Sequence, residues 1–212
     1  MARLGKPVAA LAVIAGAAVA EPVRIVALGD SLTAGYGLPL PEGFVPQLQG
    51  WLDANGVEAV VVNAGVSGDT TAGGLARVGW TLADGPDAMI VALGGNDFLR
   101  GLDPALSRAN LEGILDAAAA EDVEVLLVGL EAGPNYGPDY KAAFDEMYDA
   151  LAAEYGVLYA EDFFAGLLAE AGDQAGVAPL MQEDGLHPNA EGVAAIVAAL
   201  GPAVAALAAR AE

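Results

Sequence analysis

Residues 23–32 read Val23-Arg24-Ile25-Val26-Ala27-Leu28-Gly29-Asp30-Ser31-Leu32, and this stretch decides the fold. It is a short, strand-forming run that leads into a glycine and two polar side chains. An apolar run of this length, bounded by glycine, is typical of a strand buried on both faces, as in a parallel sheet. We therefore expect a strand that ends near Gly29, with Asp30 and Ser31 beyond its carboxyl end.

The same pattern recurs along the rest of the chain. Further strands are predicted over residues 57–62, 88–93, 123–128 and 157–159. Helices are predicted between and after them, over residues 45–54, 70–83, 104–120, 139–155 and 189–209. Asp69 and Asp103 are the predicted N-caps of the second and third of these helices. The alternation predicts an α/β fold, a three-layer α/β/α sandwich around a flavodoxin-like, doubly wound sheet of about five parallel strands.

Residues 1–20 have the layout of a secretory signal peptide. Arg3 and Lys6 give a basic start, an apolar run follows, and Ala18-Val19-Ala20 supplies the small residues of a cleavage site. The apolar run is shorter than the roughly 20 residues that span a bilayer. We expect a periplasmic or secreted protein, with a signal peptide over 1–20 and a single domain over 21–212. The alternative is a retained anchor or a buried helix. No other segment is expected to be apolar for long enough to insert stably in a membrane.

The chain is strongly acidic. Its 212 residues include 8 Lys and Arg against 29 Asp and Glu, a net charge of −21, and removal of residues 1–20 makes this −23. Such a surface repels nucleic acid and anionic lipid headgroups, so we expect no nucleic-acid partner. The sequence contains no cysteine, so the core must hold the fold together without disulfides.

Polar residues follow three of the predicted strands, at the edge where ligands of open parallel sheets bind. They are Asp30-Ser31, Asn63 with Ser67-Gly68-Asp69, and Asn96-Asp97. Ser31 follows its strand directly, where the amides and dipole of a helix N-terminus favour negative charge, and this suits a nucleophile. The alternative is an N-cap serine that only satisfies helix amides.

His187 is the only histidine in the chain, and it precedes the last predicted helix. A hydroxyl nucleophile needs a neighbouring base, and histidine titrates in the right range. The imidazole in turn needs a partner that fixes its tautomer. Asp184 lies three residues earlier, a spacing at which one tight turn brings both side chains to the same side. Glu183 is the main rival for this role.

Two further residues are candidate donors for an oxyanion. Asn96 follows a buried strand, and its side-chain amide can donate toward developing negative charge. Gly68 can offer a backbone N–H from its loop, and the Ser31 N–H would be the third donor. The alternatives are an Asx turn at Asn96 and an ordinary loop glycine at Gly68.

Taken together, four blocks resemble the signatures of the SGNH (GDSL) hydrolase family. They are Gly29-Asp30-Ser31-Leu32, Ser67-Gly68-Asp69-Thr70, Gly94-Gly95-Asn96-Asp97 and Asp184-Gly185-Leu186-His187-Pro188. Their order and spacing look closest to the periplasmic acyl-CoA thioesterase, lysophospholipase and arylesterase group. The resemblance implies that Ser31 is the nucleophile, His187 the base and Asp184 its orienting partner. It also implies an oxyanion hole formed by Ser31, Gly68 and Asn96, and no metal or cofactor.

The same resemblance places the substrate-binding residues on two loops. Phe98 and Leu99 follow Asn96, and Pro134 and Tyr136 lie in a segment that is similar to the same group. Phe98 stands where close relatives often carry glycine. Glu131 and Gly133 stand where they often carry a basic residue and a proline. We expect these departures to affect the groove for the acyl chain.

The expected function is hydrolysis of carboxylic esters or thioesters through an acyl-enzyme, by a monomer acting on small acyl substrates such as acyl-CoA, lysophospholipids or aryl esters. One alternative is a carbohydrate O-acetyl esterase, which uses the same constellation. Another is a non-catalytic binding domain on the same fold, since fold alone does not establish function. A nucleotide-binding function is not expected, because no phosphate-binding glycine motif follows a strand.

Overall fold

The computed structural model describes residues 21–172 and 174–212, so the predicted signal peptide over residues 1–20 lies outside the described residues. Five parallel strands form one sheet, in the order β2-β1-β3-β4-β5. This flavodoxin-like order confirms the predicted fold class. The strands are β1 (Val23–Gly29), β2 (Ala59–Gly65), β3 (Ala88–Ala92), β4 (Glu124–Val128) and β5 (Leu158–Ala160).

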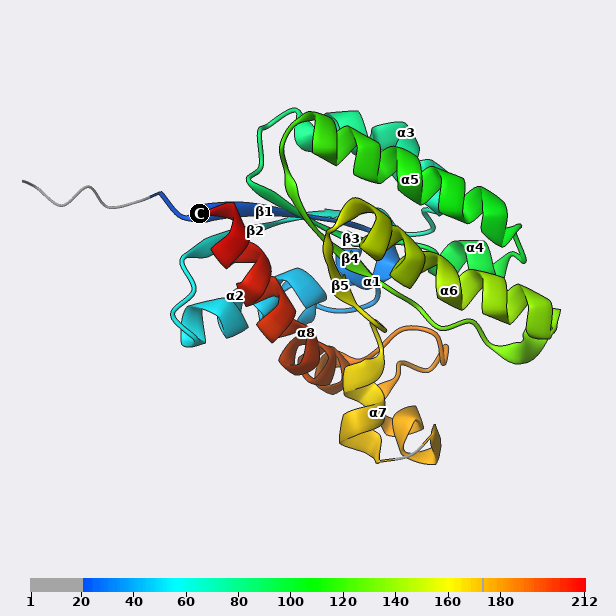
Figure 1. Cartoon of the computed structure of the whole chain (residues 1–212). Helices are drawn as coiled ribbons and strands as arrows, with labels where there is room; N and C mark the ends of the chain where they lie inside the picture. Colours follow the sequence, from blue (N-terminus) through cyan, green and yellow to red (C-terminus); the bar gives the residue numbers. More distant parts are fainter. Residues whose placement is uncertain (1–20, 173) are drawn as a thin grey trace, which may run out of the picture.

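Helices cover both faces of the sheet (Figure 1). One face carries α3 (Thr71–Leu82), α5 (Pro104–Ala120) and α6 (Pro138–Tyr155); the other carries α2 (Phe44–Ala54), α7 (Ala165–Ala171) and α8 (Ala190–Ala211). Two short helices, α1 (Ser31–Ala34) and α4 (Gly95–Leu99), begin at the carboxyl ends of β1 and β3. Three 3₁₀ segments complete the described elements: η1 (Leu40–Glu42), η2 (Pro134–Tyr136) and η3 (Gln174–Leu180).

The strands differ in burial because of their places in the sheet. The three central strands are almost wholly buried, as the sequence predicts. The prediction of burial on both faces is wrong for β2, where Val60 and Val62 are exposed, because β2 is an edge strand. This strand also runs on through Asn63 to Gly65, which pairs with Gly29, and so it includes residues that were expected to follow it.

The open edge of β2 is covered by a side chain. Gln49 of α2 accepts a hydrogen bond from the Val61 N–H at 2.9 Å, and its own amide donates to the Ala59 carbonyl at 2.9 Å. A free strand edge invites pairing with another chain. Gln49 occupies two of the backbone groups that such pairing would use.

The helix ends confirm one predicted cap and correct another. Asp103 caps α5 by accepting from the Ala105 N–H at 2.9 Å. The prediction of Asp69 as the cap of α3 is wrong, because the Thr70 hydroxyl accepts from the helix amide of Gly73 instead. The Asp69 carboxylate pairs with Arg77 at 2.6 Å.

The short helices α4 and α7 were not predicted. A helix of two turns or fewer is too short to show a helical period in the sequence.

The C-terminal helix α8 is 22 residues long and has a mean hydropathy of 2.1 over its most apolar stretch. By length and composition it could cross a membrane, which corrects the expectation that no second segment could. Its apolar residues, including Val193, Ile196 and Leu200, are buried within the core, as in the core helix of a globular domain. The helix ends beside the start of β1 (Figure 1), and Arg210 lies 4.0 Å from Glu124 at the start of β4.

Candidate active site

Ser31 is the first residue of α1, directly after the buried strand β1. Asp30 is the N-cap, and its carboxylate accepts from the Leu32 N–H at 3.0 Å. The helix ends one turn later at Gly35, whose φ of +81° is the left-handed conformation that favours glycine. Ser31 is therefore held on a tight strand-to-helix turn, with its hydroxyl at the carboxyl edge of the sheet. It is not the residue that caps the helix.

The structure brings Ser31, His187 and Asp184 into one hydrogen-bonded line. The Ser31 Oγ lies 2.8 Å from Nε2 of His187, and Nδ1 of His187 lies 2.7 Å from Asp184 Oδ2. A proton on Nδ1, donated to Asp184, leaves Nε2 free to accept from the serine hydroxyl. Glu183, the rival for the orienting role, has no such contact with the imidazole among the described hydrogen bonds.

Asp184 is also bonded to the backbone of its own turn. Its Oδ1 accepts from the N–H groups of His187 at 3.0 Å and Leu186 at 2.9 Å. The backbone hydrogen bond from His187, followed by the bond to its side chain and the one from Leu186, lowers the pKa of Asp184 from 3.8 to about 2. The carboxylate therefore stays ionised over the range in which an imidazole titrates.

The candidate oxyanion donors lie beside this line. Asn96 is the second residue of α4, and its Nδ2 donates to the Asp69 carbonyl at 2.9 Å and to Asp30 Oδ2 at 3.2 Å. Gly68 has a φ of +87° in the loop after β2, and Arg100 donates to its carbonyl at 2.9 Å. These bonds draw the loop after β2 and helix α4 toward the residue that precedes Ser31.

Two networks that the sequence analysis missed hold these loops in place. The carboxylate of Asp97 is buried and accepts from the backbone N–H of Thr71 at 2.8 Å, from its hydroxyl at 2.6 Å and from Ser107 Oγ at 3.0 Å. Arg77 donates to the carbonyls of Gly29 at 2.9 Å and Ala64 at 2.7 Å as well as to Asp69. The first network anchors α4 to α3 and α5, and the second joins the ends of β1 and β2. Neither motif spacing nor periodicity indicated these contacts.

The predicted substrate-binding residues lie together on α4 and η2. The Phe98 and Tyr136 rings meet edge to face with centroids 5.9 Å apart, and the Tyr136 hydroxyl donates to the Leu99 carbonyl at 3.3 Å. Pro134 begins η2. A Cβ added to Gly133 would lie 3.3 Å from Phe98 Cζ, so the glycine allows the ring to approach the backbone closely. The Phe98 ring of α4 and the Tyr136 ring of η2 thus form an aromatic wall where these two segments meet.

Glu131, the other departure from the family pattern, is exposed and lies 3.8 Å from Lys141 Nζ. The same ammonium group pairs with Asp145 at 2.6 Å and donates to the Ala132 carbonyl at 2.8 Å. Glu131, in the loop after β4, therefore joins a charged cluster with Lys141 and Asp145 of α6.

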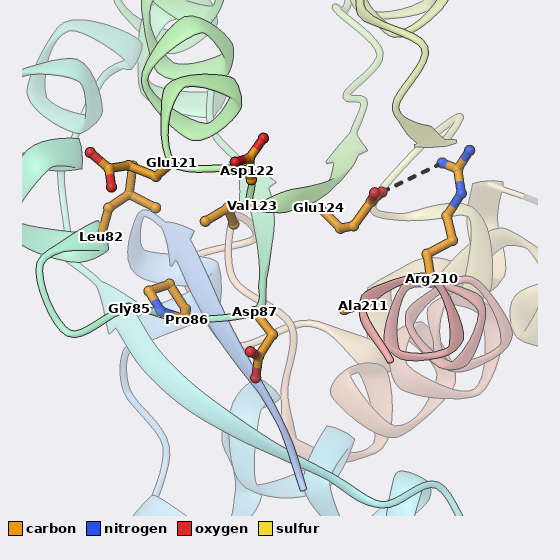
Figure 2. A pocket seen from close by; sticks show the side chains of 10 residues that line it. All are labelled: Leu82, Gly85, Pro86, Asp87, Glu121, Asp122, Val123, Glu124, Arg210 and Ala211. Carbon is orange, nitrogen blue, oxygen red and sulfur yellow. Dashed lines mark ion pairs between the residues drawn. The ribbon is translucent and has the colours of Figure 1, made fainter. Parts of the chain in front are cut away.

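A hollow of about 390 Å³ lies at the opposite end of the sheet, where the strands begin (Figure 2). Its lining is acidic, and Figure 2 shows one ion pair across it, between Glu124 and Arg210. Among the described residues that line this hollow there is neither serine nor histidine. The groups suited to acyl transfer lie at the carboxyl edge instead, where the sequence places them.

Similarity to known proteins extends over most of the chain. The profile of the GDSL-like Lipase/Acylhydrolase family matches residues 27–195. Over 180 residues the chain is 42% identical to "Esterase TesA" of Pseudomonas aeruginosa, covering 84% of this chain and 85% of that protein. It is 37% identical over 174 residues to "Thioesterase 1/protease 1/lysophospholipase L1" of Escherichia coli, covering 82% and 78%. The crystal structure of AlinE4, an SGNH-hydrolase family esterase, superposes with a TM-score of 0.72 at 42% identity, covering 89% of this chain and 98% of that one.

Proposed function

This chain belongs to the GDSL-like lipase/acylhydrolase family, and from that membership we propose that Ser31, His187 and Asp184 are the catalytic triad of an enzyme that hydrolyses esters. The observation that carries the proposal is the continuous line of hydrogen bonds, 2.8 Å from Ser31 Oγ to His187 and 2.7 Å from His187 to Asp184. Nucleophile, base and orienting carboxylate are thus within reach of one another without rearrangement.

In the first proposed step, Ser31 Oγ attacks the carbonyl carbon of the substrate while His187 Nε2 takes the hydroxyl proton. The Asp184 carboxylate stabilises the imidazolium that forms, and it keeps the ring in the orientation required for the transfer. The carbonyl oxygen becomes an oxyanion as its π bond opens.

The proposed donors to this oxyanion are the N–H groups of Ser31 and Gly68 and the side-chain amide of Asn96. Preorganised donors of this kind supply much of the rate enhancement in acyl transfer. Asn96 Nδ2 lies 3.2 Å from Asp30 Oδ2 and 2.9 Å from the Asp69 carbonyl oxygen, so its hydrogen bond to Asp30 is the longer of the two. We therefore assign the hydrogen of that longer bond to the oxyanion.

The tetrahedral intermediate then collapses. His187 gives its proton to the leaving alcohol or thiol, the bond to the leaving group breaks, and the acyl group remains on Ser31 Oγ. A water molecule repeats the sequence with His187 as base, which releases a carboxylic acid and restores the serine hydroxyl. All proton transfers in both halves use His187.

The proposed substrates are carboxylic esters and thioesters with apolar or aryl groups, the class that includes acyl-CoA, lysophospholipids and aryl esters. The aromatic wall of Phe98 and Tyr136 supports this choice, because such side chains offer apolar contact area beside the site. We further propose that the protein acts as an exported monomer after cleavage before Glu21. N-terminal sequencing of the secreted or periplasmic protein, with its mass in solution, tests both points.

The central experiment compares the native protein with Ser31→Ala on p-nitrophenyl acetate and butyrate. The variant is expected to fold normally and to lose hydrolysis and labelling by a fluorophosphonate probe. Activity retained in Ser31→Ala contradicts the proposed triad. Labelling without turnover on acyl-CoA, lysophospholipids or aryl esters, but with release of acetate from acetylated sugars, would favour the carbohydrate esterase.

A further inference from the structure

The proposed catalytic hydrogen bond joins two segments that lie 156 residues apart, and something must hold those segments together. Asp184 cannot do so, because its contacts with His187 and Leu186 stay within one turn. They orient the imidazole relative to its own loop. They do not fix the loop relative to Ser31.

Gln182 makes the connection between the two segments. Its side-chain Nε2 donates to the Tyr36 carbonyl at 2.8 Å and to the Pro188 carbonyl at 2.9 Å. Tyr36 lies directly after the α1 turn that carries Ser31, and its own N–H donates back to the Ser31 carbonyl at 3.1 Å. The side-chain amide of Gln182 thus binds the segment that carries Ser31 through one carbonyl and the loop that carries His187 through the other.

The backbone of Gln182 strengthens the same connection. Its N–H donates to the His187 carbonyl at 2.7 Å, next to an antiparallel bridge between Met181 and Pro188. Gln182 therefore reaches the His187 loop through main chain and side chain, and the Ser31 segment through the side chain.

The segment held by Gln182 presents an aromatic ring to the base. The centroids of the Tyr36 and His187 rings lie 4.6 Å apart, with the planes tilted by 38°. Contact at this distance restricts the rotation of the imidazole and shields one side of it from water. It also places a π system beside the ring that becomes an imidazolium during the reaction.

The turn is shaped to admit Gln182. Gly37 has a φ of +76°, and a Cβ at that position would overlap Oε1 of Gln182. A side chain at residue 37 could therefore not share this space with the glutamine in its present place.

We propose that Gln182 and Tyr36 form a clamp that positions His187 against Ser31, in which Gln182 fixes the distance between the two segments and Tyr36 restrains the imidazole. Both are positioning residues, since neither touches the reacting atoms. The proposal rests on the triad proposed above. It assigns a function to two residues that lie outside the four signature blocks.

The first test replaces Gln182 by Met, which keeps the length of the side chain and removes both donors. The Gln182→Met variant is expected to lower kcat by about 10- to 100-fold, because small misplacements of reacting groups are costly, while KM changes by less than about twofold since no substrate contact is lost. Gln49→Met is the matched control: Gln49 also donates twice, to Asp53 Oδ1 at 2.8 Å and to the Ala59 carbonyl at 2.9 Å, but at the end of the sheet where the strands begin, away from the triad. Equal loss of kcat in both variants, or none in Gln182→Met, overturns the clamp.

The second test separates the ring of Tyr36 from its hydroxyl. Tyr36→Phe is expected to retain native kcat and Tyr36→Ala to lose it, because only the ring contacts His187. The chain has one histidine, so a proton NMR spectrum contains a single set of imidazole signals. The Nδ1–H signal is expected to weaken in Tyr36→Ala and Gln182→Met as the imidazole becomes mobile. A native spectrum and native kcat in Tyr36→Ala would contradict its part in the clamp.

A third pair of variants covers the case in which Gln182→Met does not fold. Gly37→Ala displaces Gln182 from its place, whereas Gly56→Ala strains a similar left-handed turn, with φ of +69°, where nothing lies nearby. Only Gly37→Ala is expected to lower kcat, and equal activity in both variants overturns the clamp. Ser31→Ala, measured alongside, keeps the two proposals apart. If it is inactive while the Gln182, Tyr36 and Gly37 variants are all native, the clamp alone is wrong.

Discussion

One carboxylate oxygen of Asp30 lies 3.2 Å from the side-chain nitrogen of Asn96, while the other accepts from the N–H of Leu32 at 3.0 Å. The residue before the proposed nucleophile thus joins α1 to the amide that is proposed to bind the oxyanion. It does so as a carboxylate that is only 2% exposed. Burial raises the pKa of Asp30 above its usual 3.8, and the bonds from Leu32 and Asn96 offset part of that rise.

The raised pKa of Asp30 gives a pH dependence with a definite sign. Between 3.8 and the higher native value, the folded protein keeps a proton on Asp30 that the unfolded chain releases, so stability falls as pH rises through this window. The Asp30→Asn variant has no ionisable group at this position and so lacks this pH dependence. The melting temperature of the variant relative to the native protein is therefore expected to increase as pH rises through the window and then to level off. Thermal denaturation of both proteins from pH 3 to 8 measures this difference in melting temperature. A difference that stays constant or decreases with pH would refute the raised pKa of Asp30.

Asn96→Ala removes one proposed oxyanion donor. We expect kcat to fall by about 10²–10³ with KM nearly unchanged, because the donor acts mainly on charge that develops in the transition state. Steady-state kinetics on p-nitrophenyl butyrate test this, with Asn55→Ala as the control, since that amide donates to the Trp51 carbonyl at the end of a helix. A large rise in KM with native kcat would instead make Asn96 a substrate-binding residue.

Asp184→Asn should keep the turn and lose the charge. We expect kcat to fall by about 10³–10⁴, since the imidazole loses the partner that fixes its tautomer. The pKa of Asp184, about 2, lies below its unfolded value of 3.8, so its contribution to stability is present above pH 3.8 and is lost as pH falls through 2. In acid unfolding, the stability deficit of the variant is thus expected to vanish near pH 2. A deficit that persists there would show that the loss is not electrostatic.

Phe98→Ala tests whether the aromatic wall contacts the acyl chain of the substrate. The Phe98 ring packs on Tyr136, Tyr140 and Phe144, so we expect a loss of stability of about 1–3 kcal/mol, less than for a fully buried phenylalanine. The space that is opened is expected to raise kcat/KM for longer acyl chains relative to acetate. A series of p-nitrophenyl esters from acetate to decanoate measures the ratio, with Leu106→Ala, an exposed residue of α5, as the control. An unchanged ratio would place Phe98 outside the acyl site.

The order of the elements, and the contact of Ser31 with His187 and of His187 with Asp184, could be predicted from the sequence. β1 and β3 are short apolar runs with polar ends, and a chain with a single histidine offers one partner for Ser31. The apolar runs do not by themselves show which strands pair, although the predicted flavodoxin-like fold implies the strand order that is found. The exposure of Val60 and Val62 follows from the place of β2 at the edge of the sheet, which depends on which strands pair. The same holds for Asp30 with Asn96 and for Gln182 with Tyr36, whose contacts join segments 66 and 146 residues apart.

The ends of the described chain both lie away from the proposed catalytic edge. β1 and β4 begin at the opposite end of the sheet, and α8 returns there, with Arg210 beside Glu124 and the C-terminus beside the start of β1 (Figure 1). An anchor attached after Glu212 would hold the molecule on a solid support with Ser31 facing the solution. A short linker could also join the C-terminus to the start of the domain, and new ends could then be opened in an exposed loop. Attachment at the C-terminus is thus a route to an immobilised catalyst with an unobstructed site, and circular permutation is a way to move the ends elsewhere.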